Sequence, residues 1–166
     1  PSRQTIDGVK VRRVRYAPRR LETLAATGSM YREARGPKGI LAVPMMLALA
    51  IGVWREARRE SAILYGHWWI PGGLVIAVVG ALMRCPRVVH VHGSDAAMTT
   101  NTVFKIVARW VLRVAVIRLA VSDELAKWGE QLTGRTFDVL PMPLDFDRLP
   151  TPSPVPEQGF VNQVTY

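Results

Sequence analysis

Two histidines and an aspartate lie close together in the sequence, as His90, His92 and Asp95. Residues two apart on a β-strand point to the same face, so the two imidazoles would lie side by side. With the nearby carboxylate, this pattern is similar to the start of a hydrolase metal site. The chain has only three histidines and one cysteine, however, and no further cluster supplies the remaining ligands. We therefore expect no metal and a neutral His92 that hydrogen-bonds to a ligand hydroxyl.

Several other chemistries are excluded by missing motifs. The chain contains no Gly-x-Ser-x-Gly nucleophile turn, no P-loop and no Gly-x-Gly-x-x-Gly dinucleotide fingerprint. The single Cys85 cannot form an internal disulfide, which excludes a disulfide-built secreted scaffold and a cysteine zinc module. A reducing, cytosolic setting is the simpler interpretation.

Three further segments contain candidate ligand-binding residues, and each has a structural alternative. Gly72 and Gly73 either permit a tight turn from strand to helix or let backbone amides approach a sugar or phosphate. Ser122 precedes acidic residues, which is typical of a helix cap. Trp68 and Trp69 belong either to the core or to the rim of a site, where one of them could stack on a sugar.

Alternating strands and helices must position these residues. The hydrophobic pattern predicts strands over residues 9–16, 62–66, 87–91, 115–121 and 137–140, and helices over 43–59, 74–83, 103–114 and 123–133. Residues 17–38, 67–73 and 92–102 are predicted loops or turns. Apolar strands separated by helices indicate a parallel sheet covered on both faces, so we predict a doubly wound α/β domain. Ligands bind such sheets beyond the carboxyl ends of the strands, where the candidate residues would converge.

Basic charge is concentrated in the first third of the chain. The 166 residues carry a net charge of +9, and residues 1–60 contain 13 basic and 5 acidic residues, a net charge of +8. Such a cluster could contact nucleic acid, an anionic membrane or a phosphorylated substrate, and a solvated basic surface is the alternative. Its densest part is Arg12, Arg13, Arg15, Arg19 and Arg20.

Two uncharged runs raise the question of a membrane span. Residues 61–83 contain no charged side chain, but Pro71 and two glycines divide this run near its middle. The run over residues 39–54 contains Pro44 and is short for a span, so we expect a core helix there. No signal peptide is visible at the start. Peripheral contact with a membrane stays open.

Four segments together resemble a known family. They are Ile63-Leu64-Tyr65-Gly66-His67-Trp68-Trp69-Ile70-Pro71-Gly72-Gly73, Val88-Val89-His90-Val91-His92-Gly93-Ser94-Asp95, Leu119-Ala120-Val121-Ser122-Asp123-Glu124-Leu125 and Val139-Leu140-Pro141-Met142-Pro143-Leu144-Asp145. In this order they are similar to the amino-terminal domain of family 4 glycosyltransferases of the GT-B fold. A looser similarity extends back to Asp7-Gly8-Val9.

This resemblance implies a Rossmann-like, acceptor-side domain of a retaining transferase that needs no metal. Such an enzyme moves a sugar from a nucleotide-sugar donor to a sugar or lipid-linked acceptor. The family's histidine at the position of His92 lies by the transferred sugar, so His92 is the expected catalytic residue. Asp95 would either order its loop or bind the acceptor. The expected substrate-binding residues are His67, Trp68, Gly72, Gly73, Gly93, Asp95 and Ser122.

The resemblance also implies a division into domains. Residues 1–149 would form an incomplete amino-terminal domain that lacks the family's first strand and its glycine-rich loop. Residues 150–158 would form a proline-rich linker, and residues 159–166 would begin a donor-binding domain. We therefore expect the chain alone to transfer no sugar. Pro143 replaces a glycine that is frequent in the family.

The expected location is cytoplasmic, with peripheral contact to the anionic inner face of the cytoplasmic membrane and no nucleic-acid partner. Two other classes of function stay open. One is a non-catalytic module that binds anionic lipid or glycan through its basic first third. The other is a metal-dependent hydrolase, which would hold stoichiometric metal.

Overall fold

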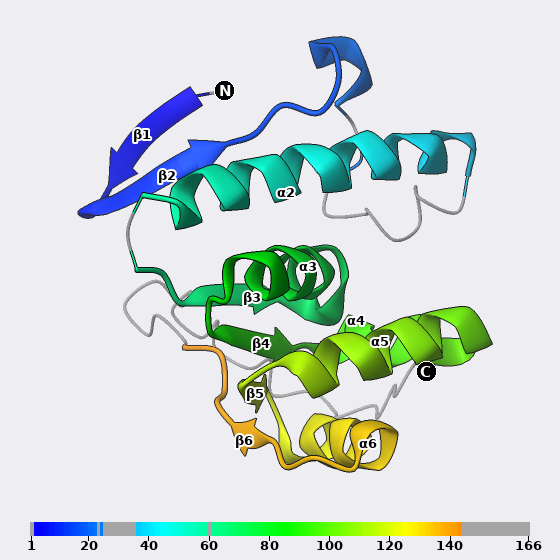
Figure 1. Ribbon diagram of the computed structural model, residues 1–166. Helices are drawn as coiled ribbons and strands as arrows, with labels where there is room; N and C mark the ends of the chain where they lie inside the picture. Colours follow the sequence, from blue (N-terminus) through cyan, green and yellow to red (C-terminus); the bar gives the residue numbers. More distant parts are fainter. Residues whose placement is uncertain (1, 23, 25–35, 60, 144–166) are drawn as a thin grey trace, which may run out of the picture.

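The computed structural model describes residues 2–22, 24, 36–59 and 61–143 (Figure 1). In chain order these form a β-hairpin, a long helix and a parallel sheet with its connecting helices. The predicted linker over residues 150–158 and the predicted second-domain start over 159–166 lie outside the described residues, as does most of the predicted loop over 17–38. Short 3₁₀ turns occur at Arg19–Leu21 and Pro37–Leu41.

The sheet has four parallel strands in the order β3-β4-β5-β6. Along the chain, each new strand is added at the same edge of the growing sheet. Right-handed crossovers therefore bring all the connecting helices to one face. Figure 1 shows these helices in a row over the sheet. The strands are Leu64–His67, Arg87–Val91, Ile117–Ala120 and Asp138–Val139, and the helices are α3 (Leu74–Met83), α5 (Thr102–Val114) and α6 (Asp123–Thr133).

This architecture confirms the α/β class with a parallel sheet and is compatible with a Rossmann-like fold. The three helices lie against one face, and the second helical layer of a doubly wound domain is not seen in the described part of the chain. The bounds of β4, α3 and α6 are those predicted from the sequence. Ser122 caps α6 as predicted, because its Oγ accepts a hydrogen bond of 3.4 Å from Leu125 N.

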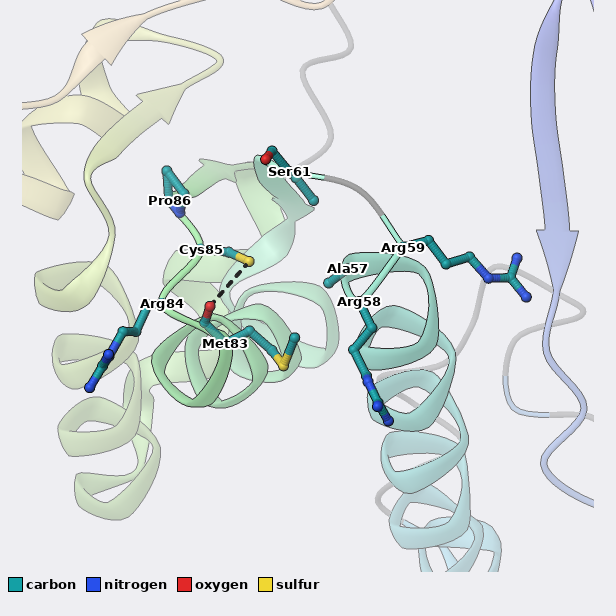
Figure 2. A pocket seen from close by; sticks show the side chains of 9 residues that line it. Ala57, Arg58, Arg59, Ser61, Met83, Arg84, Cys85 and Pro86 are labelled. Carbon is teal, nitrogen blue, oxygen red and sulfur yellow. Dashed lines mark hydrogen bonds between the residues drawn. The ribbon is translucent and has the colours of Figure 1, made fainter.

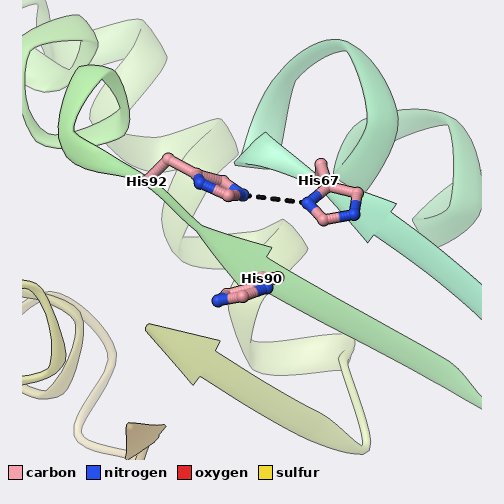
Figure 3. A group of neighbouring side chains, drawn as sticks. All are labelled: His67, His90 and His92. Atoms are coloured by element: carbon pink, nitrogen blue, oxygen red, sulfur yellow. Dashed lines mark hydrogen bonds between the residues drawn. The ribbon is translucent and has the colours of Figure 1, made fainter. Parts of the chain in front are cut away.

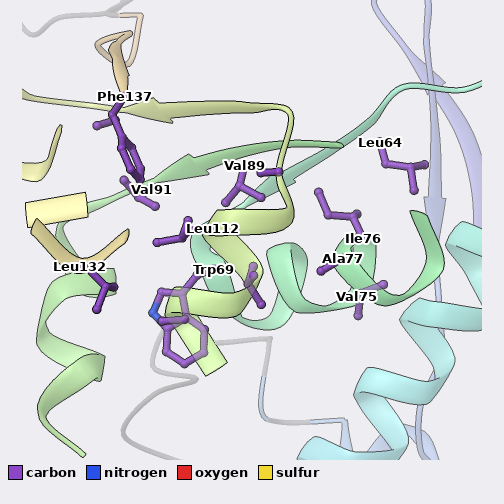
Figure 4. Close-up of a cluster of buried hydrophobic side chains, with 14 of the residues drawn as sticks. Leu64, Trp69, Val75, Ile76, Ala77, Val89, Val91, Leu112, Leu132 and Phe137 are labelled. Atoms are coloured by element: carbon purple, nitrogen blue, oxygen red, sulfur yellow. The ribbon is translucent and has the colours of Figure 1, made fainter. Parts of the chain in front are cut away.

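The hydrophobic core fills the space between the sheet and these helices (Figure 4). Val89 and Val91 of β4 point into it and are at most 1% exposed. Trp69, which follows β3, is fully buried in the same cluster. The opposite face of the sheet is less covered, since Tyr65 and Ile117 keep 46% and 45% of their surface exposed. That open face carries the histidines.

The structure contains two elements that the sequence analysis did not predict. Strand β1 (Ser2–Ile6) pairs antiparallel with β2 (Val9–Arg13) around Asp7 and Gly8, whose φ angles are +48° and +81°. An Asp-Gly pair favours such a hairpin turn and was the available signal.

The predicted loop over 92–102 was wrong, because it contains helix α4 (Gly93–Ala97) and a 3₁₀ turn, Met98–Thr100. Residues Trp68–Gly73 form one irregular π-helical turn.

Helix α2 (Ala42–Ala57) lies where a helix was predicted, and the expectation of a core helix holds for one side only, which packs on α3 and the core cluster. Only Met45, Gly52 and Ala57 of its residues are buried. The helical segment Gly39–Ala57 is long and apolar enough to cross a membrane by length and composition, and only 17% of that window is buried. One such helix is weak evidence for a span, and its exposed face needs a separate explanation.

Candidate functional site at the carboxyl edge of the sheet

Three histidines meet at the carboxyl ends of β3 and β4, on the open face of the sheet (Figure 3). Parallel pairing sets His67 beside His90, and His92 lies two residues beyond His90 on the same face. The ring centroids are 4.8 Å apart for His90 and His92, and 5.1 Å apart for His67 and His92. The predicted proximity of His90 and His92 is confirmed, and His67 joins them from the neighbouring strand.

His67 and His92 share one hydrogen bond. Their facing atoms, His67 Nδ1 and His92 Nε2, are 2.9 Å apart. One nitrogen must supply the hydrogen and the other the lone pair, so the pair can be neutral or can carry one positive charge. The His92 side chain also faces the backbone N–H of Asp95 in a capping box at the start of the helix over Gly93–Ala97. The pair can donate to or accept from a ligand hydroxyl through a ring nitrogen outside these bonds.

The third histidine is buried and held at both ring nitrogens. His90 is 2% exposed, and its Nε2 lies 3.0 Å from the carbonyl oxygen of Leu140. Since a carbonyl only accepts, Nε2 carries the hydrogen, and the Tyr65 hydroxyl donates to Nδ1 over 2.8 Å. The sequence analysis did not identify Tyr65. Its position two residues before His67, on the same face of β3, was the available signal.

Burial favours the neutral forms of His90 and His92. It lowers the pKa of His92 below its usual value, and charge on His90 or His67 would lower it further. The pKa of His90 is lowered by burial and by His67, against the opposing hydrogen bond to Leu140. Both lowered pKa values thus favour the neutral form of the imidazole.

Trp68 forms the rim of this cluster. Its side chain is 42% exposed, and its indole ring lies 5.3 Å from the ring of His92, measured between centroids. Its backbone has a φ of +58°, in the left-handed region that bulky residues rarely adopt. Strain of this kind persists where the surrounding structure fixes it, and it is concentrated at functional sites. Trp68 therefore belongs to the rim, whereas the neighbouring Trp69 belongs to the core.

Asp95 connects the loops that follow β3 and β4. It is fully buried, and its two carboxylate oxygens accept hydrogen bonds from Trp69 N at 3.0 Å and from His92 N at 2.7 Å. The Trp69 indole N–H donates to the main-chain oxygen of Asp95 over 3.2 Å. Burial raises the pKa of Asp95 to about 7, although both backbone bonds oppose the shift. Of the two roles expected for Asp95, these contacts support ordering of the loop.

The glycines predicted at the site divide into two groups. A Cβ atom on Gly72 would lie 2.5 Å from the carbonyl oxygen of His67, and one on Gly73 would lie 2.9 Å from that of Trp68. These two positions therefore require glycine because the turn packs against its own strand. A Cβ atom on exposed Gly93 would meet nothing within 4 Å, so packing does not require glycine at this position. For Ser122, the described contact is the helix cap.

The histidines are also the candidate metal ligands in the described part of the chain. One ligand atom from each lies within 4.8 Å of the others. A metal would have to replace the bond from Tyr65 to His90 and separate the 2.9 Å pair of His67 and His92. The arrangement is thus organised by its own hydrogen bonds.

A depression lies at the opposite, amino-terminal edge of the sheet, between the ends of α2 and α3 (Figure 2). Its volume is about 550 Å³, and Arg58, Arg59 and Arg84 are among its lining residues. Figure 2 shows these three side chains pointing in different directions, so they do not converge on one anion. The carboxyl edge remains the better candidate site, because its polar groups converge.

Comparison of the chain with models of known protein families found no match, and no curated protein matches it. The resemblance to family 4 glycosyltransferases therefore depends on the four sequence segments alone.

Proposed function

We propose that the chain forms the acceptor-side, Rossmann-like half of a GT-B glycosyltransferase that transfers a sugar from a nucleotide-sugar donor with retention of configuration. The observation that carries the proposal is the meeting of His67, Trp68 and His92 on the open carboxyl edge of the parallel sheet. Ligands bind at this edge in open α/β sheets. Two of the four family-like segments supply these residues.

The geometry gives each residue a distinct task. His67 orients His92 through their hydrogen bond, and this imidazole pair would hold a sugar hydroxyl. Positive charge develops on the sugar ring as the bond to the donor diphosphate breaks and the acceptor oxygen attacks. A neutral His92 can position the sugar without repelling that charge. The exposed indole of Trp68 offers an apolar surface for the sugar ring.

By this proposal the described sheet region supplies the acceptor side of a cleft, and the basic residues that hold the donor diphosphate lie outside it. No metal is required for this role.

The test is sugar transfer by the intact protein that contains this chain, assayed against a panel of nucleotide-sugars. We expect one donor to support turnover and the His92→Ala variant to lower kcat/KM by about 10²-fold, the scale for a positioned polar group. Gln131→Ala, at an exposed position of α6, is the control and should retain activity. Absence of turnover by the folded protein, or full activity of His92→Ala, would refute the proposal.

A non-catalytic module that binds anionic lipid or glycan is the second candidate. The observation that favours it is the basic hairpin, which carries Arg3, Lys10, Arg12 and Arg13. A folded protein that turns over no donor, and whose binding to acidic vesicles is lost when Arg3, Lys10 and Arg13 are neutralised, would support this alternative.

A further inference from the structure

Helix α2 exposes a continuous apolar stripe. Its members recur every three or four residues, so they lie on one side of the helix. Their exposed fractions range from 39% for Trp54 to 79% for Ile40. We use the name α2 stripe for four residues of α2 and one of the preceding 3₁₀ turn: Val43, Leu47, Ile51, Trp54 and Ile40.

The other side of α2 is already occupied. The helix packs against α3, and Met46, Leu49 and Val53 contact the core cluster. The stripe therefore points away from the core of the described residues. An exposed patch of this kind marks an interaction surface in a folded protein.

Arginines border the stripe. Arg12, Arg15 and Arg55 line a shallow depression of about 220 Å³ together with Ile51. At the end of the stripe, the guanidinium of Arg58 lies 4.6 Å from the centre of the Trp54 ring. The apolar residues and the cationic rim thus form one continuous surface.

The hairpin adds positive charge that is only partly balanced. Arg3 of β1 pairs in register with Arg12 of β2, and like charges directly opposite each other destabilise a hairpin. Glu56 forms ion pairs with both Arg12 and Arg59, so one carboxylate serves two guanidinium groups. An anionic surface would relieve this excess of positive charge.

We propose that the α2 stripe and its arginine rim bind the surface of an anionic lipid bilayer. The stripe would enter the boundary between headgroups and acyl chains, with α2 parallel to the membrane and the arginines on lipid phosphates. Spanning the bilayer would instead require α2 to leave α3 and expose Met45 and Ala57, which are each 7% exposed. The proposal is independent of sugar transfer, because binding needs no donor.

Vesicle sedimentation of the full chain tests the proposal. The probes are vesicles of phosphatidylcholine with about 30% phosphatidylglycerol, and vesicles of phosphatidylcholine alone. We expect binding to the acidic vesicles that is about tenfold weaker without phosphatidylglycerol. It should also weaken at about 1 M salt, where the screening length falls to about 3 Å.

Two sets of variants separate the contributions to binding. The stripe variant combines Leu47→Ser, Ile51→Ser and Trp54→Ser, and it should weaken binding to acidic vesicles by about tenfold or more. The rim variant combines Arg15→Gln and Arg55→Gln, and it should remove most of the preference for acidic over neutral vesicles. Combined Ile63→Ser and Val116→Ser, at positions 71% and 60% exposed outside the stripe, is the control and should bind normally. Unchanged circular dichroism would show that each variant folds.

Four outcomes would overturn the proposal. The first is a folded chain that does not bind acidic vesicles, and the second is a stripe variant that binds as tightly as the original. The third is self-association without lipid that the stripe variant abolishes, which would assign the stripe to a second copy of the chain. The fourth is retention in the vesicles after carbonate extraction, which would show that α2 spans the bilayer and does not bind at its surface.

Discussion

The carboxyl edge of the sheet and the surface of α2 use polar side chains in opposite ways. At the sheet edge, His90 and Asp95 are buried, and each is hydrogen-bonded to groups from other loops. On α2 and the hairpin, arginines stand beside exposed apolar residues. The first arrangement fixes a few hydrogen-bonding groups for a ligand of defined shape, whereas the second suits a broad charged surface.

The comparison also concerns stability. Buried hydrogen-bonded groups are costly to change because their partners lose solvent and gain nothing in return. Exposed charges are screened by water and contribute little to folding. Substitutions in the two regions should therefore differ strongly in their effect on the free energy of unfolding.

Removal of the Asp95 carboxylate should have the largest effect on stability. Asp95→Ala leaves the N–H groups of Trp69 and His92 without acceptors, so we expect a loss of about 2–5 kcal/mol in the free energy of unfolding. Urea denaturation followed by circular dichroism measures it. Arg15→Ala, on the exposed hairpin side, is the control and should change stability by less than about 1 kcal/mol. Equal losses in the two variants would invalidate the contrast between the regions.

Two glycines within the site offer a sharper comparison. Gly72→Ala would set a methyl group 2.5 Å from a backbone oxygen and should cost about 1–3 kcal/mol of unfolding free energy. Gly93→Ala meets open space and should change stability by less than about 1 kcal/mol. Thermal unfolding of both variants provides the measurement. If Gly72→Ala were as stable as Gly93→Ala, the close approach to His67 would be wrong.

The smallest predicted effect is in the pH dependence of stability. The lowered pKa values of His90 and His92 mean that the native protein binds fewer protons than the unfolded chain below about pH 6.5, so their contribution is lost as the pH falls. The Asp95 pKa, raised from 3.8 to about 7, acts in the opposite direction, because its contribution is lost as the pH rises toward 7. We expect a shallow profile in the original protein.

Removing the histidines should reveal the contribution of Asp95. In a His90→Gln, His92→Gln variant, the free energy of unfolding should increase as the pH is lowered from 7 to about 5. Urea denaturation at several pH values gives both profiles. A variant whose stability falls with pH as that of the original does would contradict the assignment of these groups.

The sequence alone determined most of the regular structure of the sheet region. Helix α6 follows from Ser122 and the acidic residues behind it, because a cap is a local interaction between neighbours in the chain. Helix α3 and strand β4 follow from apolar patterns that are themselves local. Because an Asp-Gly pair is also a local signal, the β-hairpin could have been predicted and was missed.

Tertiary structure decided what these elements face. An apolar run predicts a helix but does not specify which side is covered, so only packing against α3 showed that α2 exposes its stripe. His90 binds a carbonyl 50 residues away, and Asp95 binds Trp69 from another loop. The sequence alone predicted that His90 and His92 share a face, because residues two apart on a strand point to the same side. The contact of His92 with His67 arose only when two strands paired, since pairing depends on the whole sheet.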